Sequence, residues 1–260
     1  MGATVWGEIL PVLAALFISV LATLLIAFRL PESKPCHLKR SPERANVRKI
    51  LGQEQKDCYE LKAAEKIGAK SCFKIKHLPY LMILYFLTFF GFNLFYTAFP
   101  IHAVKSLNWS VQDTGTFFAA LSFMMVVVQG PILKQAANRY SEGLLIIAGS
   151  FILATNFLLL ISRSTLMIYA AAALFAIGNG IMWPSVLSVL SKVAGQQYQG
   201  AVQGYASSIG SVASIIGLII GGIIYEVLGT WVFAVSAVLI YSVFLMSFRM
   251  LSIEKGFKKN

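Results

Sequence analysis

The chain contains seven apolar stretches, and their uneven spacing restricts its fold more than any other feature. One stretch comes first, at residues 9–28, and a polar linker follows at 29–77. Six further stretches are joined by very short connectors, at 78–99, 114–133, 143–161, 166–190, 201–225 and 231–248. A membrane-spanning helix needs ~20 mainly apolar residues. The sequence therefore predicts an all-α integral membrane protein with seven transmembrane helices, the last six forming one bundle.

The composition excludes a soluble domain. Hydrophobic residues make up 57% of the chain and charged residues only 13%, which is too few to build a water-facing surface. The first stretch does not resemble a signal peptide, because Glu8 precedes it and no Lys or Arg occurs before Arg29. We expect it to be a retained helix.

The basic residues predict the orientation of the chain in the membrane. The net charge of +11 is explained by topology, since Lys and Arg collect on the cytoplasmic side of membrane proteins. With the linker in the cytoplasm, 20 of the 22 Lys and Arg residues lie inside, and only Lys105 and Arg163 lie outside. We therefore expect an external N-terminus, a cytoplasmic C-terminus, a location in the cell membrane and no nucleic-acid partner.

The residues that usually carry chemistry are scattered. Cys36, Cys58 and Cys72 all lie in the linker, without a CxxC pair or a cluster of histidines. No metal site, cofactor site or catalytic constellation is visible in this pattern. We expect the protein not to be an enzyme.

Three segments carry a resemblance to a known family. Residues 29–33 read Arg-Leu-Pro-Glu-Ser; the connector after the third stretch runs from Gly130 to Lys134 and on through Arg139; and the sixth stretch holds Gly200, Gly204 and the glycine-rich run 216–222. The first resembles the ending after the sixth helix in drug-efflux members of the major facilitator superfamily. The second is similar to the superfamily's cytoplasmic loop motif, with Lys134 and Gln135 where stronger copies have Asp and Arg. The third resembles its eleventh helix, with Leu218 where Pro often stands.

The resemblance implies a domain organisation and a function. It makes residues 1–30 the last helix of a first half, 31–77 a basic cytoplasmic linker, 78–250 a complete second half and 251–260 a cytoplasmic tail. It implies transport of a small organic molecule by alternating access, with efflux of amphiphilic compounds. Such a partial transporter requires a separately encoded first half or a second copy of itself.

Polar and aromatic residues at helical spacing are the candidates for a substrate cavity. Tyr85, Phe89, Asn93 and Tyr96 recur along one face of the second stretch. The other candidates are Ser122 and Gln129 on the third stretch, with Met125 between them, Asn156 on the fourth, and Asn179 and Trp183 on the fifth. Gly178, Gly180 and Pro184 interrupt the fifth stretch, as in transporter helices that bind substrate at mid-membrane. The alternative is that these amides only join helices.

A second set of residues is assigned to packing and gating. Small residues at Gly204, Gly217 and Gly221 leave one side of the sixth stretch free of bulk, which allows backbones to approach closely. Gly130, Lys134 and Arg139 are assigned to the cytoplasmic connector, where cations are favoured near helix C-termini. His102 lies at the outer rim, either as a hydrated interfacial histidine or as a proton-linked gate.

Two other classes of protein fit part of the pattern. A seven-helix receptor shares the predicted topology, but its usual Asp-Arg-Tyr-like triplet is missing after the third stretch, which ends at Gln129-Gly130-Pro131, and residues 231–248 hold no Pro. A non-transporting membrane scaffold or assembly partner is the other alternative. The sequence leaves the substrate, the direction of transport and the coupling ion open.

Overall fold

A computed structural model describes residues 2–29, 75, 77–162 and 164–257 of the chain. It divides the chain into two compact units, Met1–Ala64 and Glu65–Asn260. The first unit contributes the helix α1, Gly2–Arg29. The predicted linker falls almost entirely outside the described residues. The cytoplasmic location of its three cysteines and the boundaries of the linker therefore remain predictions.

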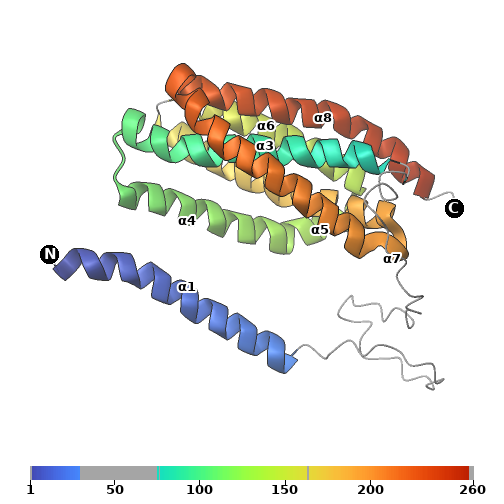
Figure 1. Cartoon of the computed structure of the whole chain (residues 1–260), viewed down its shortest axis with the longest axis horizontal. Coiled ribbons are helices and arrows are strands. Elements are labelled where there is room, and N and C mark those ends of the chain that lie inside the picture. The colour runs from blue at the N-terminus through green and yellow to red at the C-terminus, as the bar shows by residue number, and fades with distance from the viewer. Residues whose placement is uncertain (1, 30–74, 76, 163, 258–260) are drawn as a thin grey trace. The chain divides into compact units, whose positions relative to one another are not determined.

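The second unit begins with two long antiparallel helices (Figure 1). Helix α3 spans Leu78–Leu107, and α4 begins at Val111 and ends at Val127. A three-residue loop joins them, and residues of the loop and of the first turn of α4 determine where α3 ends and α4 begins. Asn108 adopts the left-handed conformation that ends α3, while the Ser110 hydroxyl and the Asp113 carboxylate form a capping box that starts α4.

The helix that contains α4 continues past the point where the sequence predicted a connector. The π-helical segment η2, Val128–Ile132, follows α4, and α5 extends from Leu133 to Arg139. The prediction that a connector begins at Gly130 is therefore wrong. A proline in an α-helix clashes with the preceding turn and lacks an N–H donor, and the wider π turn accommodates Pro131 without ending the helix.

The remaining helices complete the bundle. Helix α6 spans Glu142–Leu159, and α7 spans Thr165–Leu228. Gly195 interrupts α7 with a φ of 64°, which divides it into a first segment (165–194) and a second segment (196–228). The short 3₁₀ helix η3, Gly229–Trp231, leads into α8, Val232–Phe257. Both turns depend on glycine, because Gly229 also has a positive φ, of 58°.

Several of these helices have the length and composition of membrane spans. Five stretches qualify among the described residues: Leu78–Leu107, Val111–Arg139, Glu142–Leu159, Thr165–Gly195 and Tyr198–Leu251. The last has 54 residues, or roughly 80 Å of helix, far more than a ~30 Å hydrocarbon core, and Gly229 divides it. The apolar part of α1, Leu13–Arg29, is shorter. A total of seven membrane-spanning helices therefore stays a prediction.

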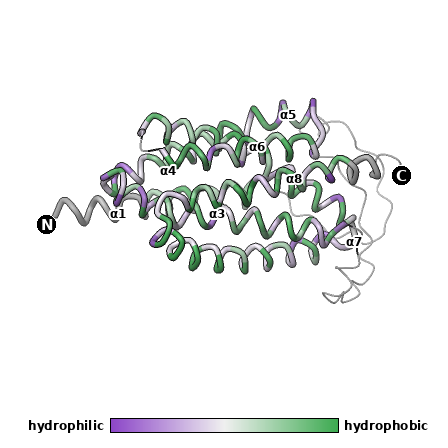
Figure 2. Tube along the Cα trace, turned by 90° about the horizontal axis from the view of Figure 1, so that it is seen from above, coloured by the Kyte–Doolittle hydropathy of each residue, from purple (hydrophilic) through white to green (hydrophobic). Residues whose placement is uncertain are grey.

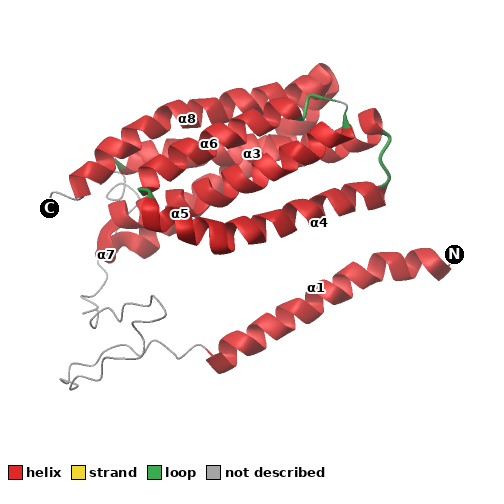
Figure 3. Ribbon diagram, turned by 180° about the vertical axis from the view of Figure 1, so that it is seen from behind, coloured by secondary structure: helices red, strands yellow, loops and turns green. Residues whose placement is uncertain are grey.

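The regular secondary structure in the described part of the second unit is all helical, and short loops join the helices (Figure 3). Hydrophobic residues run along most of the length of the helices, and hydrophilic residues gather mainly toward their ends (Figure 2). The interior is filled by aromatic and branched side chains. The largest fully buried aromatic ones are Phe95, Phe99, Phe117, Phe157, Phe175 and Phe233.

The helices differ in how much of their surface the second unit covers. Helix α6 crosses the first segment of α7 so closely that a Cβ at Gly149 would lie 2.8 Å from the carbonyl oxygen of Gly178. Helix α4 is covered much less, with only Phe117 and Leu121 buried. The second unit thus has a tightly packed interior and an outer helix that presents most of its surface outward.

Candidate functional site

Three of the predicted cavity residues form an aromatic cluster between α3 and the first segment of α7. The ring centroids of Tyr85 and Phe89 lie 4.9 Å apart, and those of Tyr85 and Trp183 lie 5.0 Å apart. Trp183 meets Phe89 edge-to-face at 5.1 Å. These separations are typical of favourable aromatic pairs. Tyr85 is buried, whereas Phe89 and Trp183 are partly exposed.

The second segment of α7 also packs against α3, and small residues make this contact possible. A Cβ at Gly210 would lie 2.9 Å from Cε1 of Tyr85. A Cβ at Gly217 would lie 2.8 Å from the Cβ of Asn93, and one at Gly221 would lie 3.2 Å from the Cα of Leu94. The close approach predicted from the spacing is therefore present at Gly217 and Gly221, and α3 is their partner.

Asn93 joins these helices by hydrogen bonds. Its Nδ2 donates to the carbonyl oxygen of Phe89 at 2.8 Å and to the Oγ of Ser214 at 2.9 Å. Asn93 therefore lies on the face of α3 that meets the second segment of α7, one turn from the aromatic cluster. Its amide ties helices together in this conformation.

Asn179 lies one helical turn before Trp183 and points toward α4. Its side chain is 7% exposed, and its Nδ2 donates to the Sδ of Met125 at 4.0 Å. Next to it, a Cβ at Gly180 would lie 2.7 Å from Cγ1 of Val128, the first residue of η2. The two residues on either side of position 179 are glycines, and they bring this part of α7 close to both α6 and η2.

The remaining cavity candidates lie outside this cluster. Tyr96 is 41% exposed, and its ring stands 6.3 Å from that of Phe118 on α4. Ser122 and Gln129 are exposed on α4 and η2. Asn156 is 1% exposed, and its Nδ2 donates to the carbonyl oxygen of Leu153 in its own helix. In this conformation Asn156 is thus a core residue of α6.

His102 is placed differently from the expectation of a hydrated histidine. It is fully buried, with its Nδ1 3.4 Å from the hydroxyl of Tyr225 and its ring 5.3 Å from that of Phe233. The Tyr225 hydroxyl is also 3.2 Å from the Oγ of Ser106. The hydrated interpretation is wrong because the second segment of α7 and the start of α8 cover this end of α3. The gating interpretation stays a prediction.

The residues assigned to gating lie at the opposite end of the bundle. Gly130 is exposed within η2, and a Cβ there would meet no atom within 4 Å. Lys134 and Arg139 are exposed on α5. The same holds for Gly204 on α7: it is exposed, and a Cβ would meet nothing within 4 Å. Gly204 therefore has no packing role inside the described unit, in contrast to Gly217.

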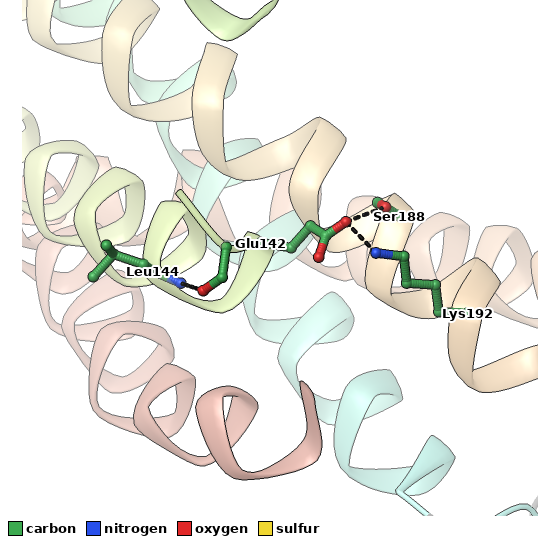
Figure 4. Close-up of polar contacts among 5 residues, drawn as sticks. Glu142, Leu144, Ser188 and Lys192 are labelled. Atoms are coloured by element: carbon green, nitrogen blue, oxygen red, sulfur yellow. Dashed lines mark hydrogen bonds and ion pairs between the residues drawn. The ribbon is translucent and has the colours of Figure 1, made fainter. Parts of the chain in front are cut away.

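An ion pair that the sequence did not reveal holds α6 to α7 at this end. The Glu142 carboxylate, in the first turn of α6, pairs with the Lys192 ammonium near the end of the first segment of α7 (Figure 4). The Ser188 hydroxyl donates to the same carboxylate oxygen at 3.1 Å. Nearby, Gln199 donates to the Oγ of Ser191 at 2.8 Å and so bridges the break at Gly195.

Sequence reasoning missed Gly210, Glu142 and Lys192 as positioning residues. Gly210 could have been found, because it continues the spacing of Gly217 and Gly221 by one heptad. Glu142 and Lys192 are 50 residues apart, and their pairing depends on how the helices dock. No group of three metal-binding side chains comes together in the part of the chain that the structure describes.

Comparison with known proteins places these features in a family. The sequence matches the Major Facilitator Superfamily over two overlapping ranges, residues 2–209 and 81–260. The class D tetracycline resistance protein of Salmonella ordonez is 26% identical over 62% of this chain, which corresponds to 41% of that protein. Multidrug resistance protein 1 of Bacillus subtilis is 26% identical over 63% of this chain and 42% of its own length.

The fold is also found in a solved structure. The human organic anion transporter MFSD10 (TETRAN) superposes with a TM-score of 0.60 and 23% identity. The match covers 65% of this chain and 40% of the transporter. The chain thus corresponds to less than half the length of these relatives. Because the family match extends over most of the sequence, this chain belongs to the Major Facilitator Superfamily as a multi-pass membrane protein.

Proposed function

We propose that the chain is one part of a transporter that moves a small organic molecule across the membrane, exporting amphiphilic compounds by alternating access. The observation that carries the proposal is the aromatic cluster of Tyr85, Phe89 and Trp183, whose ring centroids lie 4.9 to 5.1 Å apart. It joins α3 to the first segment of α7, which contains Gly178, Gly180 and Pro184, residues typical of substrate-binding helices in transporters. The interruption predicted at these residues is wrong, because α7 stays helical through them and departs from helical geometry at Gly195 instead. The names of the two bacterial relatives support a drug-like substrate.

The substrate would contact both rings and amides. Partly exposed rings at Phe89 and Trp183 offer stacking surface, and Asn179 offers hydrogen bonding one turn from Trp183. The Nδ2 of Asn93 already bonds to Ser214, so Asn93 would contact substrate only in another conformation. Three further candidates, Tyr96 on α3, Ser122 on α4 and Gln129 on η2, are exposed and would contact the substrate beyond the cluster. In this proposal Asn156 supports the core of α6 and makes no contact with substrate.

Alternating access requires a second bundle, and the second unit carries a surface suited to one. Gly204, Ser207 and Ser211 are exposed on the second segment of α7, although all three lie in a membrane-length helix. Small residues allow helices to approach closely, and exposed hydroxyls are poorly matched to lipid. This surface fits a separately encoded first half or a second copy of the chain.

The orientation follows from the same proposal. Lys134, Arg139 and Lys192 lie at one end of the bundle, together with the start of α3 that follows the basic linker. The positive-inside tendency places this end in the cytoplasm and the Asn108 loop outside the cell. Residues 31–77 then form the cytoplasmic linker, and 251–260 form a cytoplasmic tail.

A transport assay in membrane vesicles tests the proposal. The chain is produced alone and together with a first half, and saturable uptake of a panel of radiolabelled aromatic compounds is measured. We expect negligible transport by the chain alone and clear transport with the first half. Trp183→Ala should weaken apparent substrate affinity while the protein still inserts into the membrane.

Other outcomes of this assay would contradict the proposal. Robust transport by a demonstrably monomeric chain would show that no second bundle is needed. Absence of both transport and binding, in a chain that still captures a partner, would favour the membrane scaffold. The seven-helix receptor is no longer an alternative, because the chain belongs to a different family.

A further inference from the structure

The side chain of Asn179 has a hydrogen-bonding capacity that packing does not use. The residue is only 7% exposed, and its Oδ1 is buried. This oxygen accepts no hydrogen bond from the described residues. An acceptor buried without a donor is unfavourable, and most buried polar atoms in folded proteins are paired. This carbonyl therefore indicates a donor that the described part of the chain does not supply.

A role in joining helices does not explain this arrangement. The contact of Asn179 with α4 runs from Nδ2 to the Sδ of Met125 at 4.0 Å, and a thioether is a weak acceptor. Asn93 shows what an amide that joins helices looks like in the same bundle, since its Nδ2 reaches the Oγ of Ser214 at 2.9 Å. The Nδ2 of Asn179 thus donates only to a weak acceptor, and its carbonyl oxygen Oδ1 has no donor among the described residues.

The backbone around Asn179 is held firmly in place. A Cβ at Gly178 would lie 2.7 Å from the backbone nitrogen of Leu153, and one at Gly180 would lie 2.7 Å from Cγ1 of Val128. These contacts wedge the helix between α6 and η2. Trp183 follows four residues later on the same face of the helix, about 6 Å along. The acceptor and the aromatic cluster therefore keep a fixed spacing.

The stretches that surround this site supply no opposite charge. No Asp, Glu, Lys or Arg occurs within residues 78–99, 114–133, 143–161, 166–190, 201–225 or 231–248. A charged ligand placed among them would lose its hydration without compensation from this chain. The part of the site that this chain supplies therefore favours uncharged groups.

We propose that Asn179 is a specificity-determining residue whose Oδ1 accepts a hydrogen bond from the substrate, and that the substrate is an uncharged aromatic molecule bearing a donor group. This inference rests on the proposed substrate site. Met125 covers the amide in this conformation, and its flexible thioether is the group that a ligand displaces. The aromatic body of the ligand then lies against Phe89 and Trp183.

A matched pair of ligands tests the inference with the full chain in lipid nanodiscs. Binding of 2-naphthol, which has a hydroxyl donor, is compared with that of 2-methoxynaphthalene by equilibrium dialysis, with empty nanodiscs as the blank. Because leaving a buried acceptor unpaired is unfavourable, we expect 2-naphthol to bind about tenfold more tightly. The anion 2-naphthalenesulfonate should bind more weakly than 2-naphthol.

Variants assign the preference to one residue. Asn179→Leu should reduce the difference between the two ligands to less than about twofold, since it removes the acceptor at similar volume. Asn179→Ala is the second variant if the bulkier side chain impairs folding, which size-exclusion chromatography monitors. Ser185→Ala is the control, because its hydroxyl bonds to the carbonyl oxygen of Ile181 in its own helix. It should keep the preference.

The possible results separate this inference from the proposed function. Equal binding of the alcohol and the ether by the wild-type chain would overturn the inference and leave the substrate site intact. A preference that persists in a folded Asn179 variant would overturn the assignment to Asn179. If none of the three ligands binds saturably, the substrate site itself is wrong.

Discussion

Asn93 on α3 donates from its Nδ2 to the Oγ of Ser214, 121 residues further along the chain, at 2.9 Å. The bond crosses the contact where a Cβ at Gly217 would lie 2.8 Å from the Cβ of the same asparagine. A polar bond and a glycine contact thus fix the second segment of α7 on α3. The two interactions differ in strength, which makes them separable by mutation.

Loss of the Asn93–Ser214 bond should have a modest cost. Interhelical hydrogen bonds in membrane proteins contribute about 0.6–2 kcal/mol, because the unfolded state in the membrane also finds partners. We expect Asn93→Ala and Ser214→Ala each to lower stability by that order. In a double-mutant cycle on detergent unfolding, a coupling energy near zero would show that the bond makes no net contribution.

Substitutions at two glycines of α7 should have opposite outcomes. Gly217→Leu places a branched side chain where even a Cβ would lie 3.1 Å from the carbonyl oxygen of Phe90, so the helices must separate. Overpacking of this kind costs about 1–3 kcal/mol or more. Gly204→Leu meets open space within the unit and should leave its detergent stability nearly unchanged.

The same pair of variants reports on the missing partner. If Gly204 lies on the surface for a first half or a second copy, Gly204→Leu should weaken association, as measured by cross-linking in the membrane. If the two variants lose equal stability in the isolated chain, Gly204 packs against another helix of the same unit. Its assignment to an exposed surface would then be wrong.

The ion pair between Glu142 and Lys192 should make a small, salt-sensitive contribution. The two side chains are 25% and 51% exposed, and exposed pairs contribute about 0.2–1 kcal/mol. We expect Lys192→Gln to lower the thermal stability slightly and Glu142→Gln to lower it more, because the carboxylate also accepts from Ser188. The double variant Glu142→Lys/Lys192→Glu, in which the two charges are exchanged, should recover part of the stability that the single variants lose. High salt should reduce the stability difference between the wild-type chain and the single variants.

The sequence predicted those features that depend on one helix at a time. Helical spacing placed Tyr85 and Phe89 on one face of α3 and singled out Trp183, and these three rings lie together. The same reasoning also selected Tyr96, Ser122, Gln129 and Asn156, which lie outside the cluster. The resemblance to the major facilitator superfamily, drawn from short segments, is confirmed by the family match. The positions of long apolar helices were predicted for the same reason, since length and hydropathy are local properties.

Features that depend on how helices dock could not be predicted. Gly204 and Gly217 look alike in sequence, yet only Gly217 faces α3, because 13 residues of helix rotate the two onto different sides. His102 lies near a helix end, but its burial comes from Tyr225 and Phe233 on other helices. Pro131 signalled a helix end, and the π turn at η2 removed the clash that would have caused one.

The orientation of the chain can be tested by thiol labelling. Gln112 is exposed in the first turn of α4, next to the loop that we place outside the cell. A cysteine at Gln112 should react with an impermeant maleimide on intact cells, whereas the native Cys58 should react only after permeabilisation. Ser106 is a poorer position, because its hydroxyl is 3.2 Å from that of Tyr225. Labelling of Cys58 on intact cells would reverse the orientation.

Conservative substitution of Trp183 should separate substrate contact from folding. Trp183→Phe keeps an aromatic ring against Tyr85 and Phe89 but removes part of the surface on which a substrate can stack. Since a good aromatic pair contributes about 0.5–1.5 kcal/mol, apparent affinity for an aromatic ligand should fall about threefold to tenfold. Trp231→Phe is the matched control, because Trp231 is 62% exposed in η3. Binding to chain reconstituted in nanodiscs, with detergent stability measured in parallel, distinguishes the two roles. If the Trp183 variant loses stability but keeps its affinity, the cluster serves only to pack α3 against α7. The proposed substrate site would then have no basis.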